Sequence, residues 1–233
     1  MRKTFVVLGA VALMGGAVML AVGPRSATAQ GGGTVEVDVK YNGAPVVDKI
    51  KVNKDVEKCG QEATIEKVVV GSNKGLANAV VSVADAKGGQ ATAKKASVDQ
   101  HGCKFVPHVT AMTPGELELK NSDDILHNIH TYSTANPSIN KAQPKFKKTM
   151  TEKFEKPEII KLTCDVHSWM LGWVAVMPHP YFGVTDQNGV TKIENVPPGK
   201  HTVEVWHETL GKQTKDVEVK AGQTAKVSFE MKK

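Results

Sequence analysis

Three side chains that bind soft metal ions follow one another at three-residue intervals, at Cys164, His167 and Met170. The segment directly follows residues 159–163, which we predict to be a β-strand. A tight turn after a strand can direct a thiolate, an imidazole and a thioether toward one point. Sulfur ligands select copper over magnesium, calcium or manganese, and imidazole suits copper as well. The spacing therefore predicts a copper site on this turn, completed by a histidine from another strand.

The missing histidine is expected at His127, just beyond a predicted strand at residues 116–120. His130 follows three residues later. Because side chains alternate between the two faces of a strand, we expect His130 at the surface or as an outer hydrogen-bond donor. Zinc is the main rival metal, although its structural sites usually contain paired cysteines and no methionine. The remaining alternative is that these side chains are ordinary members of a β-core.

The segment 126–130, combined with the Cys-x2-His-x2-Met motif and the strand after it, resembles the cupredoxins of the amicyanin and plastocyanin kind. The resemblance covers residues 95–177. It implies a Greek-key β-sandwich that holds one type 1 copper ion. The ligands that it implies are three in the equatorial plane and one axial methionine: His127, Cys164, His167 and Met170. It also implies that the backbone amide of Asn128 donates a hydrogen bond to the cysteine sulfur and that its side chain ties the ligand strands together.

This sequence departs from the cupredoxin pattern at two positions. Val166 stands where amicyanin and plastocyanin have a proline, and Thr163 stands where an aromatic residue is common. The departures bear on the reduction potential and the choice of partner more than on the ligands themselves.

Cys59 and Cys103 remain once Cys164 is assigned to a metal. In an oxidising compartment we expect them to form a disulfide, and the alternative is a pair of buried thiols. His101 and His108 flank Cys103 and raise the alternative of a second metal site. No carboxylate or further cysteine lies at ligand spacing there, which argues against it.

Composition limits the classes of function. The chain has 233 residues, of which 40% are hydrophobic and 23% are charged, so it can bury a substantial core. Half of the net charge of +6 comes from Arg2, Lys3 and Arg25, and no nucleic-acid-binding motif is present, so we expect no nucleic-acid partner. The sequence contains no phosphate-binding glycine loop and no hydrolase motif, so we do not expect an enzyme.

A polar segment at residues 133–157 has little periodicity, and we interpret it as a long loop with at most one short helix. Seven lysines between residues 141 and 161 form a solvated face or, alternatively, a docking surface for an acidic redox partner. Lys147 and Lys148 are the candidates for that surface. We expect the edge of the His167 ring to reach the surface, with Trp169 and Leu171 forming an apolar docking patch around it.

The elements that must position these residues are short strands. Alternating segments at residues 34–40, 79–83, 201–206 and 225–231 predict an all-β protein, and no helix-scale period is found. Residues 1–29 have a basic start, an apolar run and a small-residue cleavage pattern, which predict an export signal that is cleaved or, alternatively, kept as an anchor. No later run is long enough to span a membrane. We therefore expect a monomer that is periplasmic or secreted.

Residues 183–206 contain a Thr-Asp-x-x-Gly turn and a Val-Pro-Pro-Gly turn. They resemble the second half of the transthyretin-like β-sandwich of carboxypeptidase regulatory domains, and residues 34–92 resemble its first half. We predict one discontinuous sandwich, formed by residues 34–92 and 181–233 and interrupted by a copper domain at residues 95–180. Two or three consecutive domains are the alternative.

The favoured function is that of an exported type 1 copper protein, which cycles between Cu(I) and Cu(II) and passes electrons to a redox partner protein. One alternative is a copper storage or delivery protein. Another is a structural or adhesion β-sandwich protein with a degenerate copper site.

Overall fold

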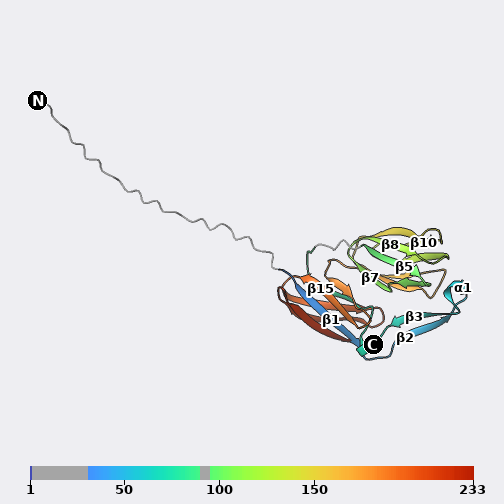
Figure 1. Ribbon diagram of the computed structural model, residues 1–233, viewed down its shortest axis with the longest axis horizontal. Helices are drawn as coiled ribbons and strands as arrows, with labels where there is room; N and C mark the ends of the chain where they lie inside the picture. The colour runs from blue at the N-terminus through green and yellow to red at the C-terminus, as the bar shows by residue number, and fades with distance from the viewer. Residues whose placement is uncertain (2–30, 90–94) are drawn as a thin grey trace. The chain divides into compact units, whose positions relative to one another are not determined.

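The computed structural model describes Met1 and residues 31–89 and 95–233, and it is almost entirely β-structure (Figure 1). The predicted all-β fold class is therefore confirmed. The predicted export signal at residues 1–29 lies outside the described residues, apart from Met1. Among the residues that the structure describes, none belongs to a helix that is both long and apolar enough to cross a membrane.

Segments from both ends of the chain form one pair of sheets. The first sheet has the order β15-β1-β18, and its strands are β1 (Gly33–Tyr41), β15 (Val190–Val196) and β18 (Thr224–Met231). The second has the order β14-β4-β16-β17, and its strands are β4 (Val80–Val83), β14 (Phe182–Val184), β16 (Gly199–His207) and β17 (Gly211–Val219). Alternate residues of β1 are buried, and Val35, Val37 and Val39 belong to a core cluster shared with β4 and β16.

The intervening residues form a second pair of sheets, which carries the predicted metal ligands. One sheet has the order β10-β9-β12-β13-β7, with β7 (Val109–Met112), β9 (His127–Tyr132), β10 (Asn140–Gln143), β12 (Glu158–Thr163) and β13 (Leu171–Val176). The other has the order β11-β8-β5-β6, with β5 (Ala96–His101), β6 (Lys104–Val106), β8 (Gly115–Asn121) and β11 (Thr149–Phe154). A separate core cluster, which includes Leu117, Ile129 and Ile160, lies between them.

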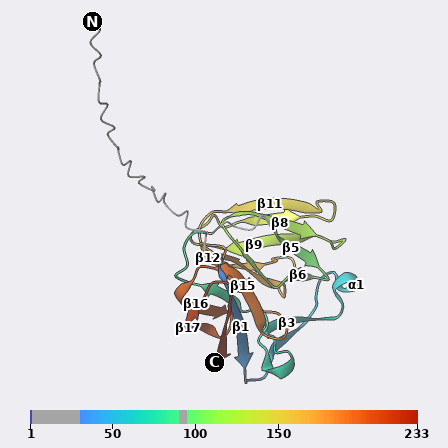
Figure 2. The same ribbon diagram turned by 60° about the vertical axis from the view of Figure 1, so that its left-hand side comes forward.

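A hairpin made of β2 (Val46–Lys51) and β3 (Glu62–Val68) stands outside both pairs of sheets. Its tip carries the short helix α1 (Val56–Cys59), and a 3₁₀ turn at Ser72–Lys74 follows the hairpin. Figures 1 and 2 both place α1 beside the sheet that contains β5 and β6. Val52, which directly follows β2, belongs to the core cluster of the second pair of sheets (the metal-site sheets).

The interpretation of residues 133–157 as a loop is wrong, because β10 and β11 lie there. Met150 and Phe154 are buried and Glu152, between them, is partly buried, so β11 does have a period-two pattern. The charged Glu152 on the inner face interrupts the apolar alternation and so conceals that pattern in the sequence. β10 is even less apparent, because only its last residue, Gln143, is buried.

Candidate metal centre

The strand pairing brings three of the four predicted ligands together, namely His127, Cys164 and His167. β9 and β12 are antiparallel neighbours, with His130 opposite Thr163. His127 is the first residue of β9, and Cys164 directly follows β12, so both lie at the same end of the sheet. The chain then turns through residues 164–170 into β13, and the amide of Met170 donates a hydrogen bond to the carbonyl of His167 across this turn.

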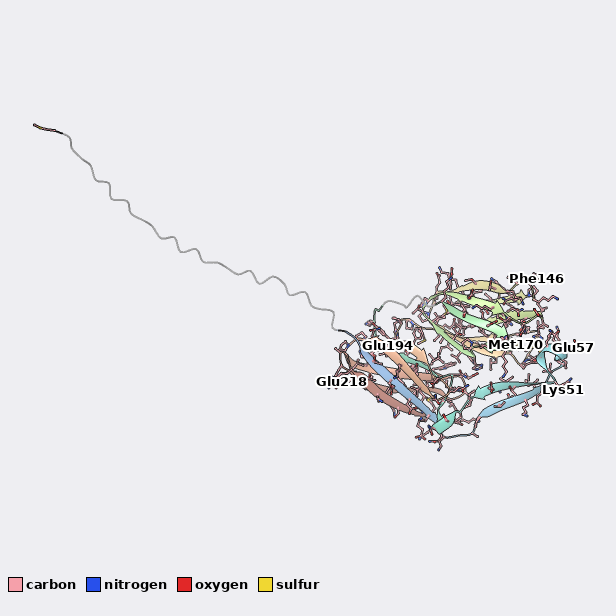
Figure 3. The ribbon with its side chains drawn as sticks, in the orientation of Figure 1. Lys51, Glu57, Phe146, Met170, Glu194 and Glu218 are labelled. Carbon is pink, nitrogen blue, oxygen red and sulfur yellow. A yellow bond between two sulfur atoms is a disulfide. The ribbon has the colours of Figure 1, made fainter. Side chains whose placement is uncertain are left out.

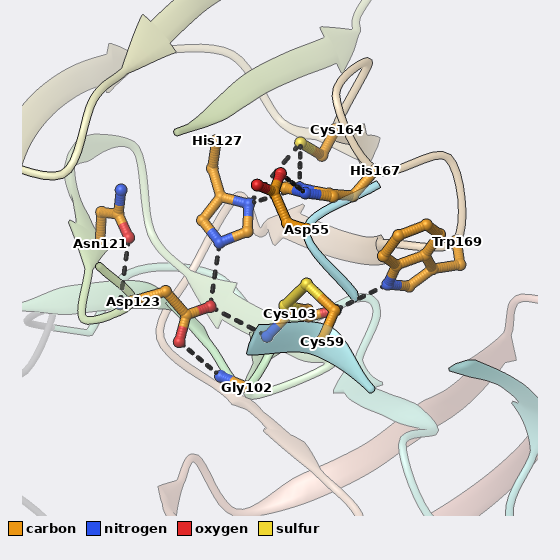
Figure 4. Close-up of a disulfide and its surroundings, with 10 residues drawn as sticks. All are labelled: Asp55, Cys59, Gly102, Cys103, Asn121, Asp123, His127, Cys164, His167 and Trp169. Atoms are coloured by element: carbon orange, nitrogen blue, oxygen red, sulfur yellow. Dashed lines mark hydrogen bonds and ion pairs between the residues drawn. A yellow bond between two sulfur atoms is a disulfide. The ribbon is translucent and has the colours of Figure 1, made fainter. Parts of the chain in front are cut away.

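Three ligand atoms converge in the interior (Figure 4). The Nδ1 atoms of His127 and His167 are 2.9 Å apart. The Sγ atom of Cys164 lies 3.9 Å from Nδ1 of His127 and 3.8 Å from Nδ1 of His167. Both histidines are 0% exposed, and Cys164 and Met170 are each 1% exposed. The site is therefore a dry pocket that faces two nitrogens and one sulfur inward.

The outward nitrogen of each histidine meets a carboxylate. Nε2 of His127 is 2.9 Å from Oδ2 of Asp123, and Nε2 of His167 is 2.9 Å from Oδ2 of Asp55. A carboxylate accepts hydrogen bonds, so it stabilises the tautomer in which Nε2 carries the hydrogen. In that tautomer each Nδ1 atom has a lone pair directed into the pocket.

Two lone pairs facing each other at 2.9 Å need a cation between them. Burial lowers the pKa of His127, although the hydrogen bond that its ring donates to Asp123 acts in the opposite direction, so an additional proton is poorly held there. A metal ion that binds imidazole and thiolate meets the same requirement without protonating either ring. The donor set thus fits a soft metal such as copper.

Asn128 organises the cysteine side of the pocket. Its backbone amide donates a hydrogen bond to Sγ of Cys164 at 3.4 Å. Its side-chain oxygen accepts from the amides of Asp165 at 2.7 Å and Val166 at 3.3 Å. Its side-chain nitrogen donates to Oδ1 of Asn140, on the neighbouring strand β10, at 2.7 Å. Asn128 therefore joins β9, β10 and the ligand turn.

The predicted disulfide between Cys59 and Cys103 is present, with Cα atoms 5.6 Å apart. It lies directly beneath the two histidines (Figure 4). Asp123 accepts hydrogen bonds from the amides of Gly102 and Cys103, both at 2.9 Å. The carbonyl of Cys103 accepts a hydrogen bond from Nε1 of Trp169 at 3.2 Å. The bridge connects the hairpin tip to the loop that holds Asp123.

The expectation that the edge of the His167 ring reaches the surface is wrong, because the ring is fully buried under Asp55 and the hairpin tip. Trp169 is 3% exposed and points to Cys103, so it cannot form the expected docking patch in this conformation. Leu171 is only partly exposed.

Lys147 and Lys148 are exposed, and Nζ of Lys148 contacts Oδ1 of Asp124 at 3.2 Å. Met170 is buried, whereas Phe146, beside these lysines in the sequence, is exposed; both are labelled in Figure 3.

The other histidines considered from sequence lie elsewhere. His130 is partly exposed, and its Nδ1 atom is 2.9 Å from Oδ1 of Asp165 in the ligand turn. His108 contacts the carboxylate of Glu208. Within residues 31–89 and 95–233, no group of three potential metal ligands includes His101 or His108. The alternative of a second site around Cys103 thus has no support there, since that sulfur is in the disulfide.

Sequence reasoning missed the two carboxylates. The sequence Asn-Ser-Asp-Asp at residues 121–124 is typical of a turn, and Asp123 is indeed in one, because its amide donates a hydrogen bond to Oδ1 of Asn121. Asp55 gave no signal by itself. The one available indication was its position four residues before Cys59. The disulfide from Cys59 to Cys103 brings this segment close to the turn that contains Asp123.

Comparison with known proteins gives limited matches. A family model described as "Polysaccharide lyase family 4, domain II" matches residues 159–227. A search of curated protein sequences found no significant match. Among solved structures, the chain is similar to a novel purple cupredoxin from Nitrosopumilus maritimus, with 20% identity, a TM-score of 0.31 and coverage of 36% of this chain and 100% of that one.

Two further structures have comparable scores. Amicyanin from Paracoccus versutus shows 19% identity and a TM-score of 0.33, over 48% of this chain and 98% of that chain. The copper-containing nitrite reductase from Thermus scotoductus shows 22% identity and a TM-score of 0.31, over 41% of this chain and 26% of that chain. At these values the neighbours add nothing to the assignment of the site, which depends on the geometry of this chain.

Proposed function

We propose that this protein is a type 1 copper protein that transfers single electrons. The observation that carries the proposal is the convergence of Nδ1 of His127, Nδ1 of His167 and Sγ of Cys164, with both outward nitrogens already bound to carboxylates. When bound, copper supplies a one-electron couple between Cu(I) and Cu(II). Met170, buried in the same turn, would be the fourth residue to hold the ion.

The residues around the pocket suit a relay better than bond-making chemistry. All three converging ligand residues are at most 1% exposed, so water and substrates are excluded. Asn128, Asp55 and Asp123 hold the ligands from outside, and a rigid ligand set keeps the change in geometry small when an electron arrives or leaves. We therefore propose an electron carrier without an enzymatic activity of its own.

The proposed location is outside the cytoplasm. The Cys59–Cys103 disulfide supports it, because disulfides persist in oxidising compartments and are rare in the cytosol. The redox partner in this proposal is a protein with acidic residues, since the exposed Lys147 and Lys148 would steer such a partner.

Copper loading tests the proposal directly. We expect the purified protein with Cu(II) to show an intense visible thiolate-to-copper charge-transfer band that disappears on reduction. Cys164→Ser should abolish the band, since it removes the sulfur ligand. His130→Ala is the matched control, because it removes a nearby histidine that faces Asp165 rather than the pocket, and it should retain the band.

Two outcomes would contradict the proposal. One is a wild-type protein that stays colourless with Cu(II) under oxidising conditions. The other is a protein that takes up zinc so tightly that excess copper does not displace it, which would make the centre structural.

A further inference from the structure

The side of His167 that faces away from the pocket is closed by the hairpin tip. Oδ2 of Asp55 lies 2.9 Å from Nε2 of His167, and the histidine is 0% exposed. The Asp55 side chain itself is 32% exposed, so it stands between the imidazole and solvent. Asp55 precedes the metal-site sheets in the sequence, since these sheets begin at β5. The contact therefore joins two residues that are 112 positions apart.

The hairpin tip holds Asp55 in a specific conformation. Asp55 precedes α1 with φ 52° and ψ 38°, a left-handed backbone that aspartate tolerates better than most residues. Its carbonyl accepts hydrogen bonds from the amides of Lys58 and Cys59, both at 2.9 Å. Cys59 is bonded to Cys103, so the disulfide fixes the turn that presents the carboxylate. The strained backbone persists because these contacts determine it.

The arrangement is repeated on the other ligand histidine. Asp123 binds Nε2 of His127 at 2.9 Å and is held by the amides of Gly102 and Cys103. One disulfide therefore anchors both carboxylates, one through Cys59 and the other through Cys103 (Figure 4). Outer carboxylates of this kind fix the tautomer and raise the basicity of metal-bound histidines.

We infer that Asp55 is a positioning residue of the metal centre, which holds His167 with Nδ1 toward the pocket and makes the centre favour Cu(II). Only the preference for Cu(II) rests on the proposed copper function; the orientation of His167 does not. The negative charge stabilises the more positive metal ion, because the contact is shielded from solvent on the histidine side. Asp55 acts through His167 and does not itself reach the pocket atoms.

The tautomer is tested in the metal-free protein. Nitrogen NMR of the imidazoles should show His167 protonated at Nε2, with a proton that exchanges slowly with water. Asp55→Ala should make this proton exchange rapidly or should allow the other tautomer. Asp55→Asn should retain it, because the amide oxygen still accepts a hydrogen bond. Slow exchange that is unchanged in Asp55→Ala would overturn the inference.

The effect of the charge is tested by the reduction potential of the copper-loaded protein. Asp55→Asn should shift the Cu(II)/Cu(I) equilibrium about tenfold toward Cu(I), which raises the potential by about 59 mV for a one-electron couple. Glu57→Gln is the matched control: it removes the same charge from the exposed face of α1 and should shift the ratio less than about twofold. Equal shifts in the two variants would overturn the inference, since only general surface charge would then matter.

The two hypotheses can fail separately. A wild-type protein that binds no copper contradicts the proposed function, whereas the NMR measurement on the metal-free protein still decides whether Asp55 positions His167. If Asp55→Ala does not fold, Asp55→Asn retains the size and hydrogen-bonding capacity of the side chain, and its potential decides the inference.

Discussion

In the proposed copper site, Cys164 would couple metal binding to proton release. Burial raises the pKa of its thiol, although hydrogen bonds from the amides of Asn128, His167 and Val166 oppose the effect. The thiol is therefore protonated in the metal-free protein at neutral pH, while only the thiolate binds metal. The pKa of His127 is lowered by burial, so this histidine is already neutral and adds no proton to the exchange.

The apparent copper affinity should consequently fall about tenfold for each unit decrease in pH, over the range from about pH 8.5 down to about pH 7. Competition with a chelator of known affinity at several pH values measures this slope. Cys164→Ser should bind more weakly and lose the slope. An affinity of the wild-type protein that does not change with pH would mean that the thiol is ionised before copper arrives or is not a ligand.

The three-residue spacing was informative because Cys164 and His167 come from one turn, in which residues close in the sequence are also close in space. His127 could be identified because it opens the strand next to that turn. Asp55 could not be. Its contact with His167 depends on a hairpin and a disulfide that bridge distant segments, and neither leaves a periodic pattern around Asp55 itself.

The β2–β3 hairpin has little core of its own, and it is joined to the metal-site sheets by the disulfide and by Ile50 and Ile65, which pack against the core cluster of those sheets. Its strands are mostly half-exposed or exposed, and Val68 is its buried residue. An isolated two-stranded hairpin is marginally stable in water. The Cys59–Cys103 bridge, with a sequence separation of 44, connects the far end of this hairpin to the metal-site sheets.

Replacing both cysteines, as Cys59→Ser with Cys103→Ser, should lower the free energy of unfolding by about 4 kcal/mol, since the closed loop restricts the unfolded chain. Denaturant unfolding of the metal-free protein measures the change. Both proteins should carry Cys164→Ser, so that the third thiol cannot form a wrong disulfide. An unchanged unfolding midpoint would show that the bridge does not stabilise the fold.

The strands were predictable to different degrees for a physical reason. β1 and β16 have one face in a core and one in solvent, so their apolar residues alternate in the sequence. β10 is an edge strand of its sheet and buries little, so its sequence reads as a loop. A discontinuous sandwich requires the pairing of β1 with β15 and β18. The exact division into domains, at residues 92–95 and 180–181, stays a prediction.

The two pairs of sheets meet around Glu208. Its carboxylate accepts a hydrogen bond from Nε1 of Trp173, on β13, at 2.7 Å and contacts His108. The ring of Trp173 meets that of Trp206, on β16, with centroids 5.3 Å apart. His207 is 1% exposed at this junction, and burial, with the nearby His108, lowers its pKa to about 4.

The junction should make the protein sensitive to acid. The unfolded chain takes up a proton on His207 as the pH falls below its ordinary pKa of about 6.5, whereas the folded protein does so only near pH 4. Stability should therefore be lost between these values, by about 3 kcal/mol from this group. His207→Gln should flatten the dependence of the unfolding free energy on pH, and His130→Gln, which removes a partly exposed histidine, should not. An identical pH profile for wild type and His207→Gln would contradict the assignment.

The place of β1 in its sheet determines when that sheet can be completed during biosynthesis. β1 is the first strand of the described chain, and it lies between β15 and β18, which are among the last. Both of its edges stay unpaired until β15 and β18 have been synthesised, while β7 to β13 can pair among themselves earlier. In that interval β1 exposes Val35, Val37 and Val39 on an unpaired strand, which is a site for aggregation. Completion of this sheet therefore competes with pairing between the β1 strands of different chains until β15 and β18 have been made.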